Sequence, residues 1–178
     1  CGIAGSVVLQ NDNKIWWAGS IVNLRIGKIH KKHYGKIFNK EFKNKGILPT
    51  DEVNGSVMLI KREVIEKIGF IDTVFFHTAE DTDYSLRAKK AGFGLCINFN
   101  SVVIHDVGKS SGGAYSSEHM YYVERGRLLL MRKWGYLNIL TFIYLLPFLL
   151  KRFLAPLVKK GNIRASFYTI KGIIAGLK

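Results

Sequence analysis

Cysteines, acidic residues and repeated segments are scarce or absent in this sequence of 178 residues. The cysteines are Cys1 and Cys96, so a disulfide scaffold is not expected, and a reducing compartment fits the composition better. The absence of internal repeats and low-complexity tracts excludes solenoid and repetitive proteins. A hydrophobic fraction of 48% excludes a disordered chain, because enough apolar surface is present to offset the entropy lost on folding.

The beginning of the chain lacks an initiator methionine and the pattern of a signal peptide, which is a basic start, an apolar run and a small-residue cleavage site. Residues 3–9 already have the composition of a strand. We therefore expect this sequence to be a fragment of a longer protein. Its length fits one core-forming domain with an appendage, since a domain typically has about 100–200 residues.

Acidic residues are outnumbered by basic ones, 13 against 27, which gives a formal net charge of +14. This excess indicates a polyanionic partner, such as nucleic acid, anionic lipid headgroups or a phosphorylated substrate. One basic cluster lies in residues 25–50, which lack clean periodicity and read as a mobile loop; a solvated face explains that cluster equally well. A second cluster follows the last apolar segment and contains no acidic residue: Lys151, Arg152, Lys159, Lys160, Arg164, Lys171 and Lys178.

The sequence shows no helix-turn-helix, zinc-ligand or RNA-binding aromatic signature. Its five histidines do not form a spaced metal-binding cluster with the two cysteines. We therefore expect no nucleic-acid partner. A basic module that binds a membrane or nucleic acid without catalysis is the alternative interpretation of the charge.

Strand and helix patterns alternate up to residue 134, which is typical of an α/β fold with a mixed sheet and covering helices. Helical patterns end at Gly69 and at Gly92, because glycine is favoured just after a helix. A third helix is predicted over residues 117–134, after a flexible loop from Gly108 to Gly113. Strands are predicted over residues 3–9, 15–18, 55–60, 95–98 and 102–105.

Residues 135–178 differ from the rest and are predicted to be a separate tail of amphipathic helices. The run Ile139–Leu150 is almost wholly apolar and is followed by Lys151 and Arg152. A helix that crosses a membrane needs about 20 apolar residues, and two cations at mid-bilayer would cost about 2.5–3.5 kcal/mol each. A helix in the membrane interface avoids this cost and keeps the cations beside anionic headgroups. We therefore predict peripheral attachment to an anionic membrane, with a buried core helix as the alternative.

The densest group of chemically active side chains is Glu80, Asp81 and Asp83. A structural interpretation is available, because Thr78 and Asp81 fit a capping box and Asp83 can pair with Arg87 four residues on, worth about 0.2–0.5 kcal/mol. A functional interpretation uses the same spacing. A carboxylate held at a helix entrance is suited to act as general base toward a sugar hydroxyl. Spacing alone does not decide between them.

A resemblance to a known family adds to the second interpretation. Residues 54–72, followed by Phe75-Phe76, Glu80-Asp81-Thr82-Asp83, Arg87-Ala88 and Ala91-Gly92, resemble bacterial family 2 glycosyltransferases. The chain is most similar to the rhamnosyltransferase-like branch, which builds cell-surface polysaccharide. The resemblance implies that residues 1–134 are the C-terminal, acceptor-side part of a GT-A catalytic domain, a Rossmann-like nucleotide-diphospho-sugar transferase fold.

The same resemblance implies an inverting transfer, with rhamnose as one candidate sugar. The donor would be a nucleotide-diphosphate sugar, the cofactor a divalent metal (Mg²⁺ or Mn²⁺), and the acceptor a saccharide or lipid-linked saccharide. The basic, apolar tail would bring the enzyme to such an acceptor on the cytoplasmic face of the cell membrane.

Roles for individual residues also follow from the resemblance. Asp81 would deprotonate the acceptor hydroxyl, with Glu80 and Asp83 supporting the site and Arg87 holding the acidic turn. Further residues would contact substrate: Gly55 and Ser56 as a small-residue turn in the pocket, Trp17, and Arg125 toward the diphosphate, although Gly126 replaces the asparagine that usually follows this arginine. His105 would contact the metal or the diphosphate, and the alternative is a structural histidine at a strand end.

The metal-binding Asp-x-Asp motif and nucleotide-binding strands of the family have no counterpart upstream of Gly55. Asp81-Thr82-Asp83 has the letters of this motif but occupies the position of the base. We therefore expect the chain to be inactive alone and active only in the full-length protein.

Overall fold

The computed structural model describes residues 1–106, 113 and 115–178. The described residues form a mixed α/β structure with a five-stranded mixed sheet, a two-stranded ribbon and six α-helices. The predicted α/β class with a mixed sheet is therefore confirmed. The chain divides into two compact units. Unit 1 holds residues 1–22, 29–73 and 80–106, and unit 2 holds residues 23–28, 74–79 and 107–178.

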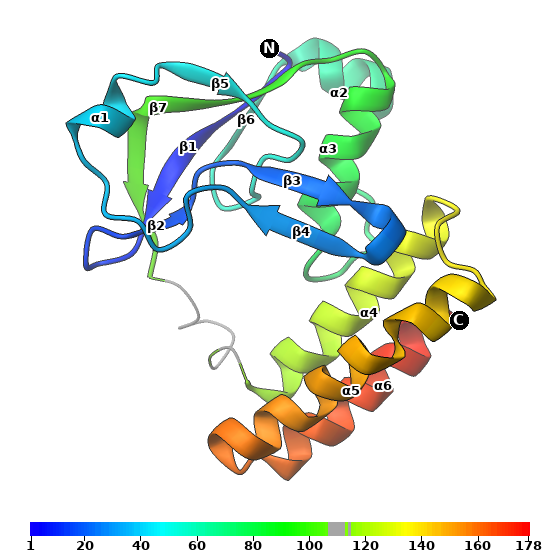
Figure 1. The fold of residues 1–178 in the computed structure, drawn as a ribbon. Coiled ribbons are helices and arrows are strands. Elements are labelled where there is room, and N and C mark those ends of the chain that lie inside the picture. The colour runs from blue at the N-terminus through cyan, green and yellow to red at the C-terminus, as the bar shows by residue number, and fades with distance from the viewer. Residues whose placement is uncertain (107–112, 114) are drawn as a thin grey trace. The chain divides into compact units, whose positions relative to one another are not determined.

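The sheet of unit 1 is built around two long neighbouring strands (Figure 1). The strands β1 (Ile3–Leu9) and β7 (Leu95–Ile104) pair in parallel along their whole length. Three short strands pair antiparallel with these two: β2 (Ile15–Trp17) and β6 (Met58–Ile60) with β1, and β5 (Ile47–Pro49) with β7. β1 is apolar at almost every position because neighbouring elements bury both of its faces.

The two strands predicted over residues 95–98 and 102–105 are one continuous strand with an irregularity between them. Ser6 pairs with Asn98, but the next residue of β1, Val7, pairs with Val102, so three residues of β7 are extra at this point. The hydroxyl of Ser101, in this insertion, shares a 2.7 Å hydrogen bond with the hydroxyl of Ser6. The polar residues Asn98, Asn100 and Ser101 therefore mark an irregular step in the strand rather than its end.

Two helices of unit 1 bury apolar side chains in the core with the sheet. They are α2 (Arg62–Ile68) and α3 (Glu80–Lys90). Both are followed by glycines with positive φ, as the sequence predicts: Gly69 at 72° and Gly92 at 92°. The shared core includes Ile3, Trp17, Val53, Val64, Tyr84 and Phe99.

The prediction of an irregular loop over residues 25–50 was wrong. This segment begins in the β3–β4 ribbon, with β3 (Ser20–Asn23) joined by a 3-10 turn, η1 (Leu24–Ile26), to β4 (Lys28–Lys31). It continues with helix α1 (Lys40–Lys43) and β5. These elements have three or four residues each, too short for a periodic pattern. They are set by side-chain caps from Asn23 and Asn39 and by the burial of Phe38 and Phe42.

The two cysteines are joined as a disulfide, Cys1 to Cys96, across 95 residues of sequence. The parallel register pairs Ala4 with Cys96, and this brings the start of the chain beside β7. This single link is not a disulfide scaffold, but it does not fit the reducing compartment that the low cysteine count favoured. The pairing depends on strand neighbours that a cysteine count does not reveal.

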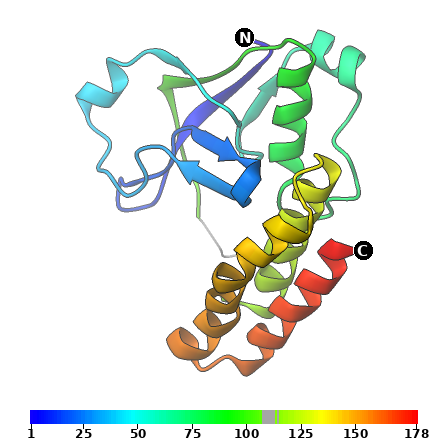
Figure 2. The same cartoon turned by 45° about the vertical axis from the view of Figure 1, so that its right-hand side comes forward.

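Unit 2 contains three long helices that lie side by side (Figures 1 and 2). They are α4 (Ser117–Lys133), α5 (Ile139–Lys160) and α6 (Ile163–Leu177). Each begins with a side-chain cap, from Ser116, Asn138 and Asn162 respectively. The boundary predicted after residue 134 falls inside this unit, because α4 packs along α6.

The helix α5 is longer than the apolar run on which the tail prediction was based. It continues for 22 residues through Pro147 and Pro156 and past Lys151 and Arg152. By length and composition it could cross a membrane, and 17% of its most apolar window is buried inside the structure. Core helices and signal sequences meet the same criterion of length and composition, so this finding alone does not place the helix in a bilayer.

Candidate functional site

The Asp81 carboxylate is held at the first turn of α3 by nitrogen donors on both oxygens. Its Oδ2 atom accepts hydrogen bonds from the main-chain N–H of Gly55 at 2.9 Å and from the side-chain amide of Asn54 at 3.3 Å. Its Oδ1 atom accepts one from the main-chain N–H of Thr82 at 2.8 Å. Three N–H groups therefore fix the orientation of an anionic side chain that remains partly exposed.

The absence of a side chain at Gly55 permits this arrangement. A Cβ atom there would lie 3.3 Å from the Cβ of Asp81 and 3.5 Å from its Oδ2 atom. The resemblance assigns this glycine to the approach of a sugar, whereas in the structure it lets its own N–H reach the Asp81 carboxylate. The structure thus brings together two segments that were predicted to share one site, residues 54–56 and the acidic first turn of α3.

A second carboxyl group, Glu52, lies buried beside Asp81 and was not predicted. The residue is 5% exposed. Its Oε2 accepts a hydrogen bond from the Ser20 hydroxyl at 2.8 Å, and its Oε1 accepts one from the Thr82 hydroxyl at 3.0 Å. Burial and then the negative charge of Asp81 raise the pKa of Glu52 to about 7, although the two hydroxyl donors and Lys31 act in the opposite direction.

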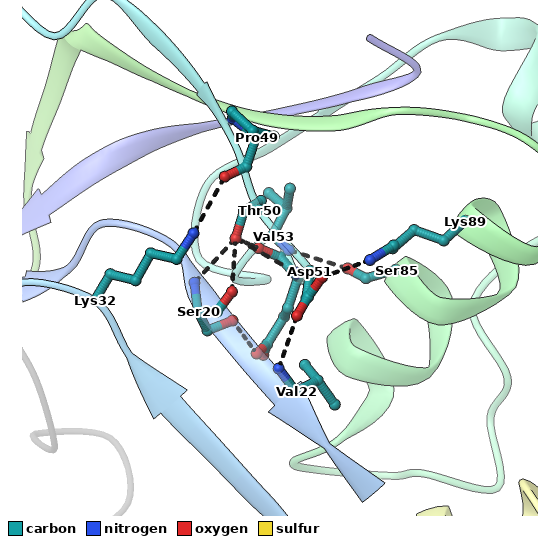
Figure 3. Close-up of polar contacts among 10 residues, drawn as sticks. Ser20, Val22, Lys32, Pro49, Thr50, Asp51, Val53, Ser85 and Lys89 are labelled. Atoms are coloured by element: carbon teal, nitrogen blue, oxygen red, sulfur yellow. Dashed lines mark hydrogen bonds and ion pairs between the residues drawn. The ribbon is translucent and has the colours of Figure 1, made fainter.

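The segment that carries Glu52 is fixed by a hydrogen-bond network in the interior of unit 1 (Figure 3). The Thr50 hydroxyl accepts from the N–H of Ser20 at 2.9 Å and donates to the main-chain oxygen of Glu52 at 2.9 Å. The N–H of Val53 donates to the Ser85 hydroxyl at 3.0 Å. Nearer the surface, Asp51 pairs with Lys89 (Figure 3). Residues 50–53 are therefore held from β3 on one side and from α3 on the other.

A cation, Lys31, lies within electrostatic range of both carboxyl groups. Its ammonium group sits over the ring of Trp16, 3.7 Å from the centroid, and 5.7 Å from the centroid of Tyr34. Burial lowers the pKa of Lys31, while the negative charges of Glu52 and Asp81 oppose that shift. The ring of Trp16 also contacts His105 edge-on, with centroids 5.6 Å apart.

The predicted substrate contact Trp17 is instead a core residue. It is 1% exposed, and its neighbour Trp16 is the tryptophan that meets Lys31 and His105. Successive side chains of a strand point to opposite faces, so Trp17 shares its face with the buried Ile15. The proposed substrate contact of Trp17 is therefore corrected to a packing role.

Asp83 and Arg87 form an ion pair that supports the turn before the site. The Asp83 side chain is fully buried, and its Oδ2 atom lies 2.9 Å from Arg87 Nε. Arg87 also donates hydrogen bonds to the main-chain oxygens of Ile68 and Phe70, both at 2.8 Å. Arg87 thus connects Asp83 of α3 to the segment that follows α2. The burial of Asp83 is the geometry of a structural group and not of a direct substrate contact.

The other predicted residues have separate surroundings. Glu80 is the first residue of α3, and the exposed Ser56 donates its hydroxyl to the Asn54 side chain. His105 follows β7, with its N–H donating to the main-chain oxygen of Leu9 at 2.9 Å. Arg125 belongs to unit 2, where it donates to the main-chain oxygen of Val74 at 2.9 Å. The predicted Gly108–Gly113 loop lies outside the described residues except for Gly113.

The capping box expected from Thr78 and Asp81 is not formed. Thr78 has a φ of 69° and Ala79 a φ of 71°, values that non-glycine residues rarely adopt. The Thr78 hydroxyl donates to the main-chain oxygen of Tyr122 at 2.7 Å instead of capping α3. The carboxylate of Asp81 is thereby left to its bonds with Gly55, Asn54 and Thr82.

A metal site is not apparent in the described part of the chain. Within residues 1–106, 113 and 115–178, no group of three or more His, Cys, Asp and Glu side chains is arranged to hold a metal ion. His105 is positioned by the ring of Trp16. The described residues thus show no cluster of three or more protein ligands for the divalent metal that the resemblance implies.

No family model matches the chain, and no curated protein shows significant similarity to it.

Proposed function

We propose that the chain is the acceptor-side part of an inverting glycosyltransferase with a GT-A fold that uses a nucleotide-diphosphate sugar. The observation that carries this proposal is the fixed Asp81 carboxylate, bonded to the N–H of Gly55 and the amide of Asn54. These bonds join the two segments on which the resemblance to family 2 glycosyltransferases depends. A partly exposed carboxylate held at a defined position is what a general base requires.

In the proposed reaction, Asp81 accepts the proton of an acceptor hydroxyl. The hydroxyl oxygen then forms a bond to the anomeric carbon of the donor sugar, from the face opposite the diphosphate. The bond from the anomeric carbon to the diphosphate oxygen breaks, and its electron pair leaves with the nucleoside diphosphate. One displacement from the opposite face inverts the anomeric configuration. The N–H groups that hold Asp81 keep its carboxylate in place before and after the proton arrives.

A divalent cation would neutralise charge on the departing diphosphate in such an enzyme. The described residues supply no cluster of ligands for it, so no step of the proposal is assigned to a metal here. Lys31 is the cation that the structure places near the two carboxyl groups. Its ammonium is positioned by Trp16 and Tyr34.

The test is Asp81→Asn in the full-length protein, with transfer measured from a panel of nucleotide-diphosphate sugars. We expect donor affinity to persist and transfer to fall by at least about 100-fold, which is the usual contribution of general base catalysis. The matched control is Asp12→Asn, which changes an exposed acid paired with Lys14. Transfer by Asp81→Asn at the rate of the control would remove the proposed base. Nucleic-acid binding without any transfer by the unmodified protein would instead favour the basic-module alternative.

The charge and the exposed apolar surface of unit 2 support a second part of the proposal, peripheral attachment to an anionic membrane. Residues 139–178 contain no acidic residue, and many apolar side chains of α5 and α6 are exposed. Exposed apolar residues of these helices include Leu140, Ile143, Tyr144, Val158, Ile163 and Phe167. Such a surface fits an acceptor that is itself anchored in lipid.

Vesicle sedimentation tests this attachment. We expect the chain to bind vesicles that contain phosphatidylglycerol, to bind phosphatidylcholine vesicles weakly, and to lose binding in high salt. The double variant Leu140→Ser, Ile143→Ser should reduce binding. Leu59→Ser is its control, because Leu59 is equally exposed, at 75%, but lies on β6. Equal effects of the two variants, or no preference for the anionic lipid, would contradict the proposal.

A further inference from the structure

Glu52 and Asp81 compete for one proton, that of the Thr82 hydroxyl. The hydroxyl oxygen of Thr82 lies 3.0 Å from Oε1 of Glu52 and 3.5 Å from Oδ1 of Asp81. A hydroxyl carries a single hydrogen, so it can donate to one of these carboxyl groups at a time. The shorter distance is that of a hydrogen bond between hydroxyl and carboxylate, and the longer one exceeds the usual range of about 2.5–3.0 Å.

The protonation of Glu52 therefore decides what Thr82 can do. An ionised Glu52 is an acceptor only, and it takes the Thr82 proton. A protonated Glu52 can donate its own hydrogen to the Thr82 oxygen, which releases the Thr82 proton toward Asp81. Because Glu52 is 5% exposed, solvent does not readily replace either bond.

The charged groups around Glu52 are Asp81 on α3 and Lys31 on β4. The other groups that touch its carboxyl are neutral hydroxyls, those of Ser20 on β3 and Thr82 on α3. One anion, one cation and two hydroxyl donors thus set the balance between the protonated and the ionised form of Glu52. Asp81 and burial favour the neutral form, while Lys31 and the hydroxyls favour the ion.

We propose that Glu52 is a positioning residue for Asp81, acting through the single proton of the Thr82 hydroxyl, and that its own protonation follows the charge of Asp81. The reaction part of this inference rests on the proposed function. When Asp81 accepts a proton, its negative charge is lost and Glu52 is more easily ionised. The two carboxyl groups together gain the one proton that leaves the acceptor hydroxyl, and the partly exposed Asp81 returns a proton to solvent after the step.

The first test needs no enzymatic activity. The carboxyl carbons of the isotopically labelled chain are titrated by NMR, and the signal of Glu52 is assigned by its loss in Glu52→Gln. We expect Asp81→Asn to lower the pKa of Glu52 by removing a neighbouring negative charge, and Thr82→Val to raise it by removing a donor to the ion. The control Asp12→Asn should leave it unchanged, because Asp12 lies in an exposed turn.

These two shifts have opposite signs, so a general loosening of the fold cannot produce both. A Glu52 signal that titrates in the ordinary range of glutamate, or that is unmoved by Asp81→Asn, would overturn the inference. If Glu52→Gln does not fold, the signal is assigned by through-bond correlations in the unmodified chain, and Thr82→Val carries the same test.

The second test uses sugar transfer by the full-length protein. We expect Thr82→Val and Glu52→Gln to move the pH dependence of kcat by about one unit while KM for the donor stays constant. A structural role alone would lower the amount of folded enzyme and leave the pH profile in place. An unchanged profile in both variants would overturn the positioning role. If the NMR shifts occur but neither the unmodified protein nor any variant transfers sugar, the coupling between Glu52 and Asp81 is supported and the proposed function is contradicted.

Discussion

Gly126 on α4 lies directly against Thr78, in the turn that precedes α3. A Cβ atom at Gly126 would be 2.8 Å from the main-chain oxygen of Thr78 and 2.8 Å from its hydroxyl oxygen. Thr78 holds its unusual positive φ while donating to the main-chain oxygen of Tyr122. The close approach of helix and turn therefore explains a glycine at the position after Arg125, where the resembled family has asparagine.

Gly126→Ala is expected to destabilise unit 2. Alanine in a helix is favoured over glycine by about 1 kcal/mol, but the added methyl group meets two oxygen atoms that cannot move independently. Overpacking of this kind costs about 1–3 kcal/mol, so the net free energy of unfolding should fall. Urea denaturation measures it. Gly94→Ala is the control, since its Cβ would meet nothing nearer than 3.8 Å. A more stable Gly126→Ala protein would contradict the contact.

The buried Glu124 should contribute more to stability than any exposed acid. Its side chain is fully buried between Arg152 at 2.6 Å and Arg127 at 3.3 Å. Glu124→Ala leaves two guanidinium groups without their counter-charge, a change that costs about 3–5 kcal/mol. Glu66→Ala removes an exposed i, i+4 partner of Arg62 and should cost less than about 1 kcal/mol. Thermal unfolding of both variants checks the difference, and similar losses would show that Glu124 is not a structural ion pair.

The parts of the fold that sequence reasoning found are those with local signals. The strand at residues 3–9 is a continuous apolar run, and the helices ending before Gly69 and Gly92 have glycine stops. The β3–β4 ribbon and α1 were not predicted, because their stability comes from asparagine caps and from a single buried ring, that of Phe42. The full length of α5 was not predicted, because the partner of Arg152 is Glu124, which lies 28 residues earlier in the chain and gives no local signal.

The candidate site was predicted only in part for a similar reason. Asp81 and Gly55 were expected in one site, and a hydrogen bond joins them. Glu52 has no local signal, because its burial results from Ser20 on β3 and Thr82 on α3. Trp16 could have been preferred over Trp17 from strand alternation, since Ile15 and Trp17 share the buried face.

The stability of the protein should depend on pH through Glu52. Its pKa is about 7 in the folded protein against an ordinary value of 4.5 for glutamate, so the folded state binds more protons than the unfolded state between these values. The stabilisation is complete below the lower pKa and is lost as pH rises through 7, with a total on the order of 3 kcal/mol. Urea unfolding at pH 5 and pH 8 should show this fall. Glu52→Gln should remove it and Glu66→Gln should not, so parallel pH curves for the unmodified protein and Glu52→Gln would contradict the raised pKa.

Gly55→Ala is expected to reduce sugar transfer with little loss of stability. The φ of Gly55 is not in the left-handed region, so alanine is permitted by the backbone and the effect comes from its methyl group. That group would lie 3.3 Å from the Asp81 Cβ, so the carboxylate must shift by a few tenths of an ångström from its N–H donor. Because a displacement of about 1 Å at a reacting group can cost 100-fold in rate, we expect kcat to fall by about tenfold. Transfer kinetics and urea unfolding, with Gly94→Ala as the matched glycine control, separate a misplaced base from a misfolded protein. Unchanged kcat in Gly55→Ala would mean that the bond from Gly55 does not set the working position of Asp81.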